Sequence, residues 1–464
     1  MINVSNAAKD FYISENPERE LIVTIGSGDS AFTLTSKQII KESMELKEAI
    51  SESDSLEFVG CIASQFTLQI VGVKQKLKNK EISVSMRSQV GEIPLFNGTI
   101  NSDERTANRR LKEIKAYDAL YNVSDTDVTN YVNSYHWPVK FKKFRNDFFD
   151  HIGITQKVQN LSSDDITIYG PELPLITEEP EQYLPENKTL TALDVMKAIC
   201  QFEGVFGIIN RYNKFEYRKL AKYSDDDGAY PGAELIPPFV PGIGGVDVVA
   251  DAQFFPSYRS LSMETYNVNN IKTVVVKQND DSKTKGVKDE GGNKYIVLGN
   301  LFTMYGDKTF LNSVANNIYK NINDIDFTPF NAECIGIPYL EVGDAVEFYV
   351  YDFEASEKQK TDVYVIQTFF VLSRTLTGIM STKDVLSASA EKRKKRISDL
   401  GIRISLEAKT EKLEKEVKDV KDQTSGFDER IENLEDNSLK CYSVQTEPTN
   451  WMPNSIYLIQ GTVN

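Results

Sequence analysis

The chain has 464 residues, which is long enough for two to four domains with buried cores of ordinary size. Hydrophobic residues make up 40% and charged residues 26%, as in ordinary soluble proteins, and this composition argues against disorder over most of the chain. The formal net charge of −15 disfavours nucleic acids and anionic membranes as partners, because like charges repel each other.

The sequence has no pattern of a secreted or membrane-spanning protein. No apolar run reaches the roughly 18–20 residues of a membrane helix, and no signal-peptide pattern opens the chain. The four cysteines, Cys61, Cys200, Cys334 and Cys441, are far apart and form no CxxC motif. We therefore expect buried free thiols in a protein made in the cytoplasm, without stable membrane insertion.

Residues 1–120 predict a first β domain. Apolar side chains alternate with polar ones in two segments, which indicates strands with one buried face and one wet face. The alternating residues are Phe66, Leu68 and Ile70 in the first segment and Ile82, Val84 and Met86 in the second. Asn97 and Gly98 form a dipeptide typical of a turn, and we expect one there.

Residues 121–220 predict a mixed α/β domain. One helix is indicated by apolar residues at helical spacing before Gly153, namely Phe141, Phe144, Phe148 and Ile152. A second helix should begin at Thr191, because Asp194 stands three residues later as in a capping box, and it should end at Gly204. A hairpin is expected over 205–220.

Residues 221–385 predict a second β domain with one amphipathic helix, which carries Leu311, Val314, Ile318 and Ile322 on one face. Strands are expected over 345–351, 362–372 and 376–380. The acidic segment 224–228 could bind calcium loosely, but it lacks the other positions of an EF-hand loop. A solvated loop is the favoured interpretation.

Residues 386–440 predict a coiled coil, followed by a short β segment or tail over 441–464. Four consecutive heptads share one register, and two of the four a positions are Thr. So narrow an apolar stripe needs other chains to cover it; the alternative is one long helix lying on its own body. The apolar residues of this oligomerisation seam are Leu406, Leu413, Val417, Val420, Phe427, Ile431 and Leu434.

No segment predicts catalysis, cofactor binding or a metal centre. The two histidines read as structural: His136 lies in an aromatic corner beside Trp137, and His151 ends a helix. The sequence leaves open a catalytic pair of Cys200 with His151. Cys200 lies on an apolar helix face, however, which favours an inert thiol. The basic run 392–396 has no aromatic neighbours for nucleotide stacking, which favours a solvated junction.

Several segments, spread over about residues 20–390, carry a resemblance to a known family. They lie at 34–43, 56–66, 93–100 (IPLFNGTI), 114–120, 199–210 (ICQFEGVFGIIN), 336–346 (GIPYLEVGDAV) and 374–379. In order and spacing they resemble tail-tip proteins of phages and prophages of Gram-positive bacteria, of the prophage tail endopeptidase-like or baseplate hub family. In the segment 341–344 we expect a turn into a strand, with Gly343 at positive φ, rather than a site.

The resemblance implies a fold that is mainly β with α+β insertions: a hub with two tube-like β domains per chain, followed by the C-terminal coiled coil. It implies a homotrimer in the tail tip of a virion, assembled in the cytoplasm of the bacterial host. Its partners would be the distal tail or tube protein and, at the C-terminus, a fibre, spike or receptor-binding protein. The role would be to close or adapt the tail tube for host attachment and for delivery of the genome or tube.

We expect no enzymatic activity, no cofactor and no metal. Many relatives carry a C-terminal peptidoglycan-degrading domain, whereas this sequence has only the predicted coiled coil and about 24 residues there. Two alternatives stay open: a tail-associated peptidoglycan hydrolase, and an adhesin that binds the cell wall.

Overall fold

The computed structural model divides into two units, Met1–Ile402 and Arg403–Asn464. It describes residues 2–14, 18–51, 58–107, 110–170, 189–220, 253–255, 258–264, 271–278, 282–323, 325, 327–379, 382–388, 395–397, 440–444, 450 and 455–459. The predicted coiled-coil seam and the acidic segment 224–228 lie outside the described residues. In the second unit, β23 (Lys440–Val444) and β24 (Ser455–Ile459) form a parallel pair.

The first 120 residues form strands, as predicted, after a short N-terminal helix that the sequence patterns did not indicate. In chain order the elements are α1 (Asn6–Ile13), β1 (Glu20–Ile25), η1 (Gly28–Ser30), β2 (Phe32–Thr33), η2 (Lys41–Ser43), β3 (Glu45–Ala49), β4 (Gln65–Val71), β5 (Glu81–Ser88), β6 (Gly91–Arg105) and β7 (Leu111–Tyr117). Burial alternates along β4 and β5, because every second side chain points into the core.

The predicted turn at Asn97 and Gly98 is wrong, because both residues lie inside the continuous strand β6. Gly98 pairs with Ile82 of β5, and a Cβ atom there would collide with the carbonyl of Tyr117 and the ring of Phe96. The glycine therefore permits close approach of a neighbouring strand.

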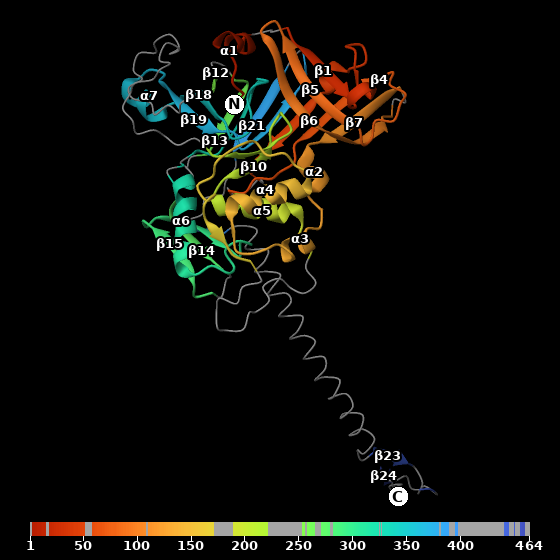
Figure 1. Ribbon diagram of the computed structural model, residues 1–464, viewed down its shortest axis with the longest axis vertical. Helices are drawn as coiled ribbons and strands as arrows, with labels where there is room; N and C mark the ends of the chain where they lie inside the picture. The colour runs from red at the N-terminus through yellow and green to blue at the C-terminus, as the bar shows by residue number, and fades with distance from the viewer. Residues whose placement is uncertain are drawn as a thin grey trace, which may run out of the picture. The chain divides into compact units, whose positions relative to one another are not determined.

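The middle region contains the predicted helices and hairpin. Its elements are α2 (Ala119–Val123), α3 (Thr129–Asn133), β8 (Val139–Lys140), α4 (Phe141–Ile152), β9 (Thr167–Ile168), α5 (Ala192–Glu203), β10 (Phe206–Ile209) and β11 (Phe215–Arg218). Thr191 and Asp194 make the capping box that opens α5, and Gly204 ends it at a φ of 73°. The rings of Phe141 and Phe202 lie 4.7 Å apart, which packs α4 against α5 (Figure 1).

The later region is again rich in strands. It contains β12 (Gln253–Phe255), β13 (Ser260–Met263), β14 (Ile271–Lys277), β15 (Lys285–Asp289), β16 (Asn293–Leu298), α6 (Lys308–Ile322), β17 (Phe330–Ile335), β18 (Ala345–Tyr351), α7 (Phe353–Gln359), β19 (Tyr364–Phe370), β20 (Ser373–Thr377), β21 (Lys383–Ala388) and β22 (Lys395–Ile397). Helix α6 buries the four predicted apolar residues against the β14–β16 sheet. Strand β22, within the range predicted as coiled coil, pairs with β16.

One sheet of eleven strands joins the two β-rich regions, which confirms the mainly β prediction. Its order is β13-β17-β21-β20-β3-β4-β7-β6-β5-β1-β2. Antiparallel pairing of β3 with β20, from Glu45 opposite Thr377 to Ala49 opposite Ser373, connects residues more than 300 positions apart. This β3–β20 junction makes a single sheet from two parts of the sequence.

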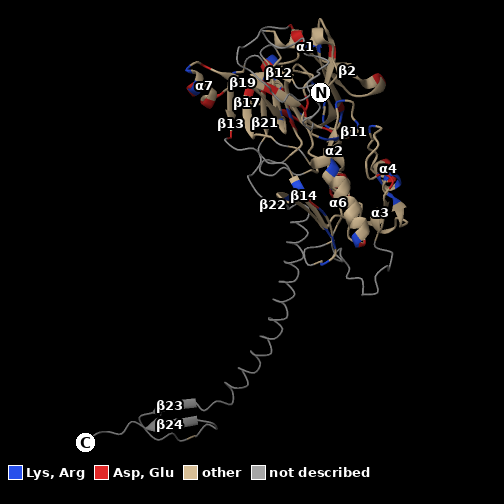
Figure 2. Cartoon of the chain, turned by 90° about the vertical axis from the view of Figure 1, so that its left-hand side faces the viewer, with Lys and Arg blue, Asp and Glu red and all other residues tan. Residues whose placement is uncertain are grey.

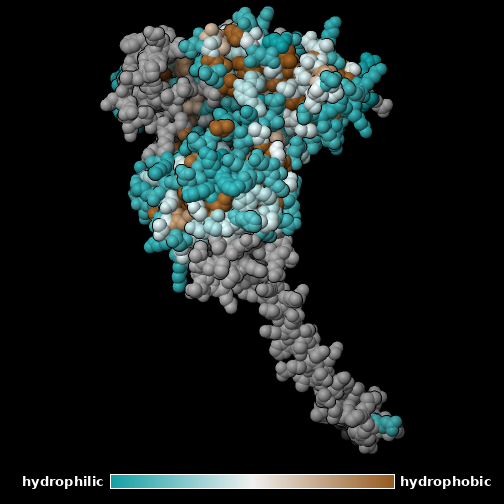
Figure 3. All heavy atoms as spheres, in the orientation of Figure 1, coloured by the Kyte–Doolittle hydropathy of each residue, from teal (hydrophilic) through white to brown (hydrophobic). Residues whose placement is uncertain are grey.

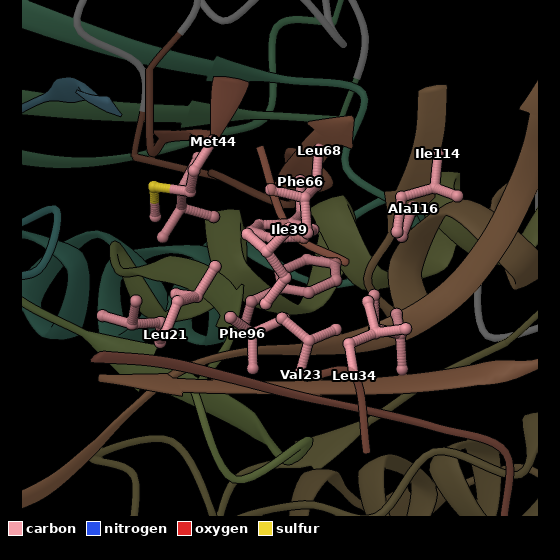
Figure 4. Packing of buried hydrophobic residues seen from close by; sticks show 14 of the residues in the cluster. Leu21, Val23, Leu34, Ile39, Met44, Phe66, Leu68, Phe96, Ile114 and Ala116 are labelled. Carbon is pink, nitrogen blue, oxygen red and sulfur yellow. The ribbon is translucent and has the colours of Figure 1, made fainter. Parts of the chain in front are cut away.

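The core of the first region also extends across the junction. Phe66 of β4 stacks on Phe96 of β6 with ring centroids 5.6 Å apart, among side chains such as Val23 and Leu68 (Figure 4). Leu376 of β20 and Ile379 belong to the same buried cluster. Burial of these apolar side chains therefore stabilises the junction together with the backbone hydrogen bonds.

A chain that ends at residue 402 should keep the eleven-stranded sheet, because every strand pair of the first unit lies before that point. We expect its far-UV circular dichroism per folded unit and its melting temperature to match those of the full chain. A chain that ends at residue 388 is the matched comparison. It lacks β22, exposes the edge of β16 and should melt lower. Unfolding of both truncated chains would contradict this boundary.

Candidate functional site

The loop of residues 336–344 connects β17 to β18 and has no strand ladder of its own. Gly343 takes a φ of 89° and donates its N–H to the carbonyl of Val371, and β18 begins two residues later. The predicted turn with Gly343 at positive φ is therefore confirmed. A buried loop without a ladder leaves carbonyl oxygens that need other donors.

Four arginines supply most of those donors. Arg19 binds the carbonyl of Gly336, Arg374 binds Ile337 and Leu340, Arg211 binds Pro338 and Leu340, and Arg218 binds Val342. We call Arg19, Arg211, Arg218 and Arg374 the arginine cluster. Five of the seven carbonyls from residue 336 to 342 are thus held by guanidinium groups. The other two accept from the backbone N–H groups of Ile2 and Asp344.

Three carboxylates offset most of the positive charge of the four arginines. Asp384 of β21 accepts hydrogen bonds from Nε and Nη2 of Arg374, both at 2.8 Å, and both side chains are almost completely buried. Glu341 lies 2.7 Å from Nη2 of Arg218, and Glu48 of β3 lies 3.4 Å from Arg211 and 3.5 Å from Arg374. Paired and hydrogen-bonded in this way, the buried charges avoid the large cost of isolation from water.

The cluster draws residues from every region of the first unit. Arg19 precedes β1, Glu48 lies on β3, and Arg374 lies on β20, next to it across the β3–β20 junction. Arg211 and Arg218 come from the β10–β11 hairpin of the middle region. Asn97 of β6 donates a 2.5 Å hydrogen bond to the carbonyl of Arg211. One connecting loop is therefore where the N-terminal, middle and later regions meet.

The charges around Glu341 and Arg374 favour their ionised forms. Burial by itself would raise the pKa of Glu341, but the guanidinium groups of Arg218 and Arg211 lower it to about 2. Burial likewise opposes the charge of Arg374, and Asp384 more than offsets it, so the pKa of Arg374 is raised. Arg19 has fewer charged neighbours, and burial lowers its pKa to about 10.

These contacts suit a structural role. The carboxylates paired with the arginine cluster accept hydrogen bonds from guanidinium groups, which leaves them poor general acids or bases near neutral pH. Among the described residues, no group of three or more His, Cys, Asp or Glu side chains is arranged to hold a metal ion. In the same described part, no helix is long and apolar enough to cross a membrane.

The histidines predicted as structural have different surroundings. His151 ends α4 as predicted, and its ring stacks on Tyr131 with centroids 4.1 Å apart. His136 is exposed, so the prediction of a packed corner is wrong for this residue. The neighbouring Tyr135 and Trp137 do pack, both against Phe144.

The structure also shows the surroundings of three of the four cysteines. Cys61, Cys200 and Cys334 are buried free thiols, as predicted.

A cleft of about 540 Å³ lies between α4 and residues 153–160. Two basic residues of its lining form ion pairs: Arg145 with Asp164 at 2.9 Å and Lys157 with Glu216 at 2.9 Å. Lys and Arg are interspersed with Asp and Glu over the drawn elements (Figure 2).

The arginine cluster was not foreseen from sequence. Its members extend over 355 positions, from Arg19 to Arg374, and share no motif or regular spacing. The only local signal was the segment 336–346 itself, which contains two glycines and one proline. That signal indicated the turn but not the donors that hold it.

Replacing Arg374 by Met should lower the free energy of unfolding by about 3–5 kcal/mol, because it leaves the buried carboxylate of Asp384 without its charged partner. Urea denaturation of the chain ending at residue 402 measures this. The double variant Arg374→Met/Asp384→Leu should recover part of the loss. Lys143→Met, which removes an exposed ion pair, is the control and should change stability by less than about 1 kcal/mol. Equal effects of Arg374→Met and Lys143→Met would contradict the role of the cluster.

Glu341 should make stability fall in acid. Its folded-state pKa of about 2 lies below the ordinary 4.5, so its contribution is complete above pH 4.5 and is lost as pH falls towards 2. The stability gap between the natural chain and Glu341→Gln should shrink by about 2 kcal/mol between pH 6 and pH 3. Denaturant unfolding at both pH values tests this, and a constant gap would show that Glu341 is not held ionised.

No family model matches the sequence, and no curated protein matches it either. Solved structures with partial likeness include a 43 kDa tail protein of prophage MuSo2 from Shewanella oneidensis, at 8% identity and a TM-score of 0.44, over 79% of this chain and 97% of that one. A tail protein from Neisseria meningitidis is 10% identical, with a TM-score of 0.43, over 79% of this chain and 96% of that one. A prophage tail protein from Listeria monocytogenes is 10% identical, with a TM-score of 0.42, over 79% of this chain and 94% of that one. Likeness at these scores does not establish a family for this chain.

Proposed function

We propose that this chain is a structural, non-enzymatic hub subunit of a phage-type tail tip, which closes or adapts the tail tube and connects it to fibre or tip proteins. The observation that carries the proposal is the eleven-stranded sheet, in which two β-rich regions are joined by β3 and β20 and held by the arginine cluster. The segment 336–346, which resembles the hub family, forms the loop at the centre of that cluster.

The sheet supports assembly from several copies. Its two ends are β13 and β2, and no further strand pairs with either within the described ranges. Ser260, Ser262 and Met263 of β13 are exposed. An open edge offers unpaired N–H and C=O groups to another strand. If β13 of one copy meets β2 of the next, the contact is head-to-tail, and it closes into a ring when the rotation between copies divides a full turn.

Three copies are the number that the hub resemblance implies, and each would contribute two β-rich regions to a ring of six. The arginine cluster lies inside each copy, so each chain would enter the ring with its two regions already fixed to each other. On the face shown in Figure 3, hydrophobic residues show mainly around the upper sheet, whereas hydrophilic residues cover α4 and α5. That distribution favours assembly contacts at the sheet.

The predicted coiled coil over 386–440, with seam residues from Leu406 to Leu434, would then extend the trimer and present residues 441–464 to a fibre, spike or receptor-binding protein. The other end of the ring would meet the distal tail or tube protein. Two Thr residues among the a positions weaken the seam, so the β regions would hold the trimer and the coiled coil would align it.

The chain should therefore be a trimer in solution, with a mass three times that of the 52.4 kDa chain, and the chain ending at residue 402 should stay trimeric. Light scattering coupled to gel filtration measures both. Met263→Lys places a charge on the β13 edge and should shift the population towards monomer. Phe353→Lys, at an exposed apolar residue of α7 far from the β13 edge in sequence, is the control and should leave the population unchanged. A stable monomer at micromolar concentration would refute the hub proposal.

A further inference from the structure

The folded chain brings two cysteines together that lie 139 positions apart in sequence. The sulfur of Cys61 lies 3.8 Å from the sulfur of Cys200, and both residues are buried. Cys61 belongs to the segment between β3 and β4, and Cys200 lies on the last turn of α5. Sulfur atoms at this distance are in van der Waals contact, without a bond.

Gly207 makes room for the two sulfurs. Strand β10 passes between the segments, with a bridge from Gly60 to Gly207, and the N–H of Cys61 donates to the carbonyl of Gly207 at 2.6 Å. A Cβ atom on Gly207 would lie 2.8 Å from each sulfur. A side chain at this position would crowd both sulfurs, so the glycine leaves room for the two thiols to move.

We propose that Cys61 and Cys200 are a disulfide-forming pair, which closes when the protein meets a small oxidant of the peroxide class. A disulfide bond of about 2.05 Å requires the sulfurs to approach by a little under 2 Å in total, a distance that small rotations of both side chains can supply. The bond would connect the first β region to α5 and so add a covalent link between the sheet and the helical layer.

The chemistry needs one peroxide molecule per bond. The thiolate of one cysteine attacks a peroxide oxygen, which breaks the O–O bond, releases water after protonation and leaves a sulfenic acid. The sulfur of the second cysteine then displaces the hydroxyl group as water and forms the S–S bond. In total, two thiols and one hydrogen peroxide give one disulfide and two waters. The two electrons pass from the sulfurs to the peroxide oxygens.

Burial makes this pair slow to react. Burial first, and then the adjacent Cys61 thiol, raise the pKa of Cys200 well above its ordinary value. The Cys200 thiolate is therefore rare at neutral pH, and burial keeps the oxidant away from both sulfurs, so the pair closes only on prolonged exposure. The rate should therefore rise with pH as the Cys200 thiolate becomes more abundant.

The test uses the full-length chain, purified under reducing conditions and then incubated with hydrogen peroxide. The protein is then denatured, its remaining thiols are alkylated, and its tryptic peptides are measured by mass spectrometry. We expect a linked pair of peptides, 48–74 and 198–211, lighter than their sum by two hydrogen atoms. The melting temperature should rise by about 5 °C, because the bond closes a loop of about 140 residues, and dithiothreitol should reverse the rise.

Single variants separate this pair from the other thiols. Cys61→Ser and Cys200→Ser should each abolish the linked peptides and the reversible rise in melting temperature. Cys334→Ser is the matched control, since Cys334 is also buried but its sulfur faces the carbonyl of Asp384 at 3.8 Å, and this variant should keep both effects. Cys441→Ser excludes links between chains through that residue and should likewise keep both effects.

Two results would overturn the proposal. One is recovery of Cys61 and Cys200 as alkylated thiols under conditions that oxidise exposed thiols completely. The other is their recovery as separate sulfinic acids, which would mean that the sulfurs do not approach each other during oxidation. Both results come from the natural chain, so neither depends on whether a variant folds.

Discussion

Hydrogen bonding of the 336–344 loop by four arginines is the constraint on which the first unit depends. The loop is buried where three regions of the chain meet, and a buried carbonyl without a donor costs roughly 1–3 kcal/mol. Five of its carbonyls find their donors in guanidinium groups. Most of the charge of the arginines is offset by carboxylates, which come from β3, β21 and the loop itself. The need to satisfy one loop therefore fixes the positions of several distant elements.

Arginine suits this task better than lysine. A planar guanidinium has five donors in a fixed arrangement, so Arg374 can hold both oxygens of Asp384 and two backbone carbonyls at once. An apolar side chain in place of Arg374 would leave the carbonyl of Ile337 without its donor. The cluster thus adds directional bonds at the β3–β20 junction, where the apolar contacts of Leu376 and Ile379 are not directional.

Local features of the fold could be predicted from sequence, because they depend on neighbours in the chain. The capping box of Thr191 and Asp194 and the helix-ending Gly204 are examples, as is the apolar face of α6. Gly98 was misread as part of a turn because its function depends on Tyr117 of a neighbouring strand, which no local pattern reveals. The candidate site was invisible for the same reason, since Arg19 and Arg374 acquire their common role only through the fold.

The β3–β20 junction and the arginine cluster also determine which surfaces are left for assembly. They satisfy the inner edges of both β-rich regions within one chain, and in the described part of the sheet only β2 and β13 end without a partner strand. A chain whose two halves were joined loosely could pair its inner edges with another copy as readily as with itself. Fixing the halves to each other removes that competition and directs any strand pairing between copies to the outer edges. In the ring that we propose, this internal rigidity would set the angle between successive contacts.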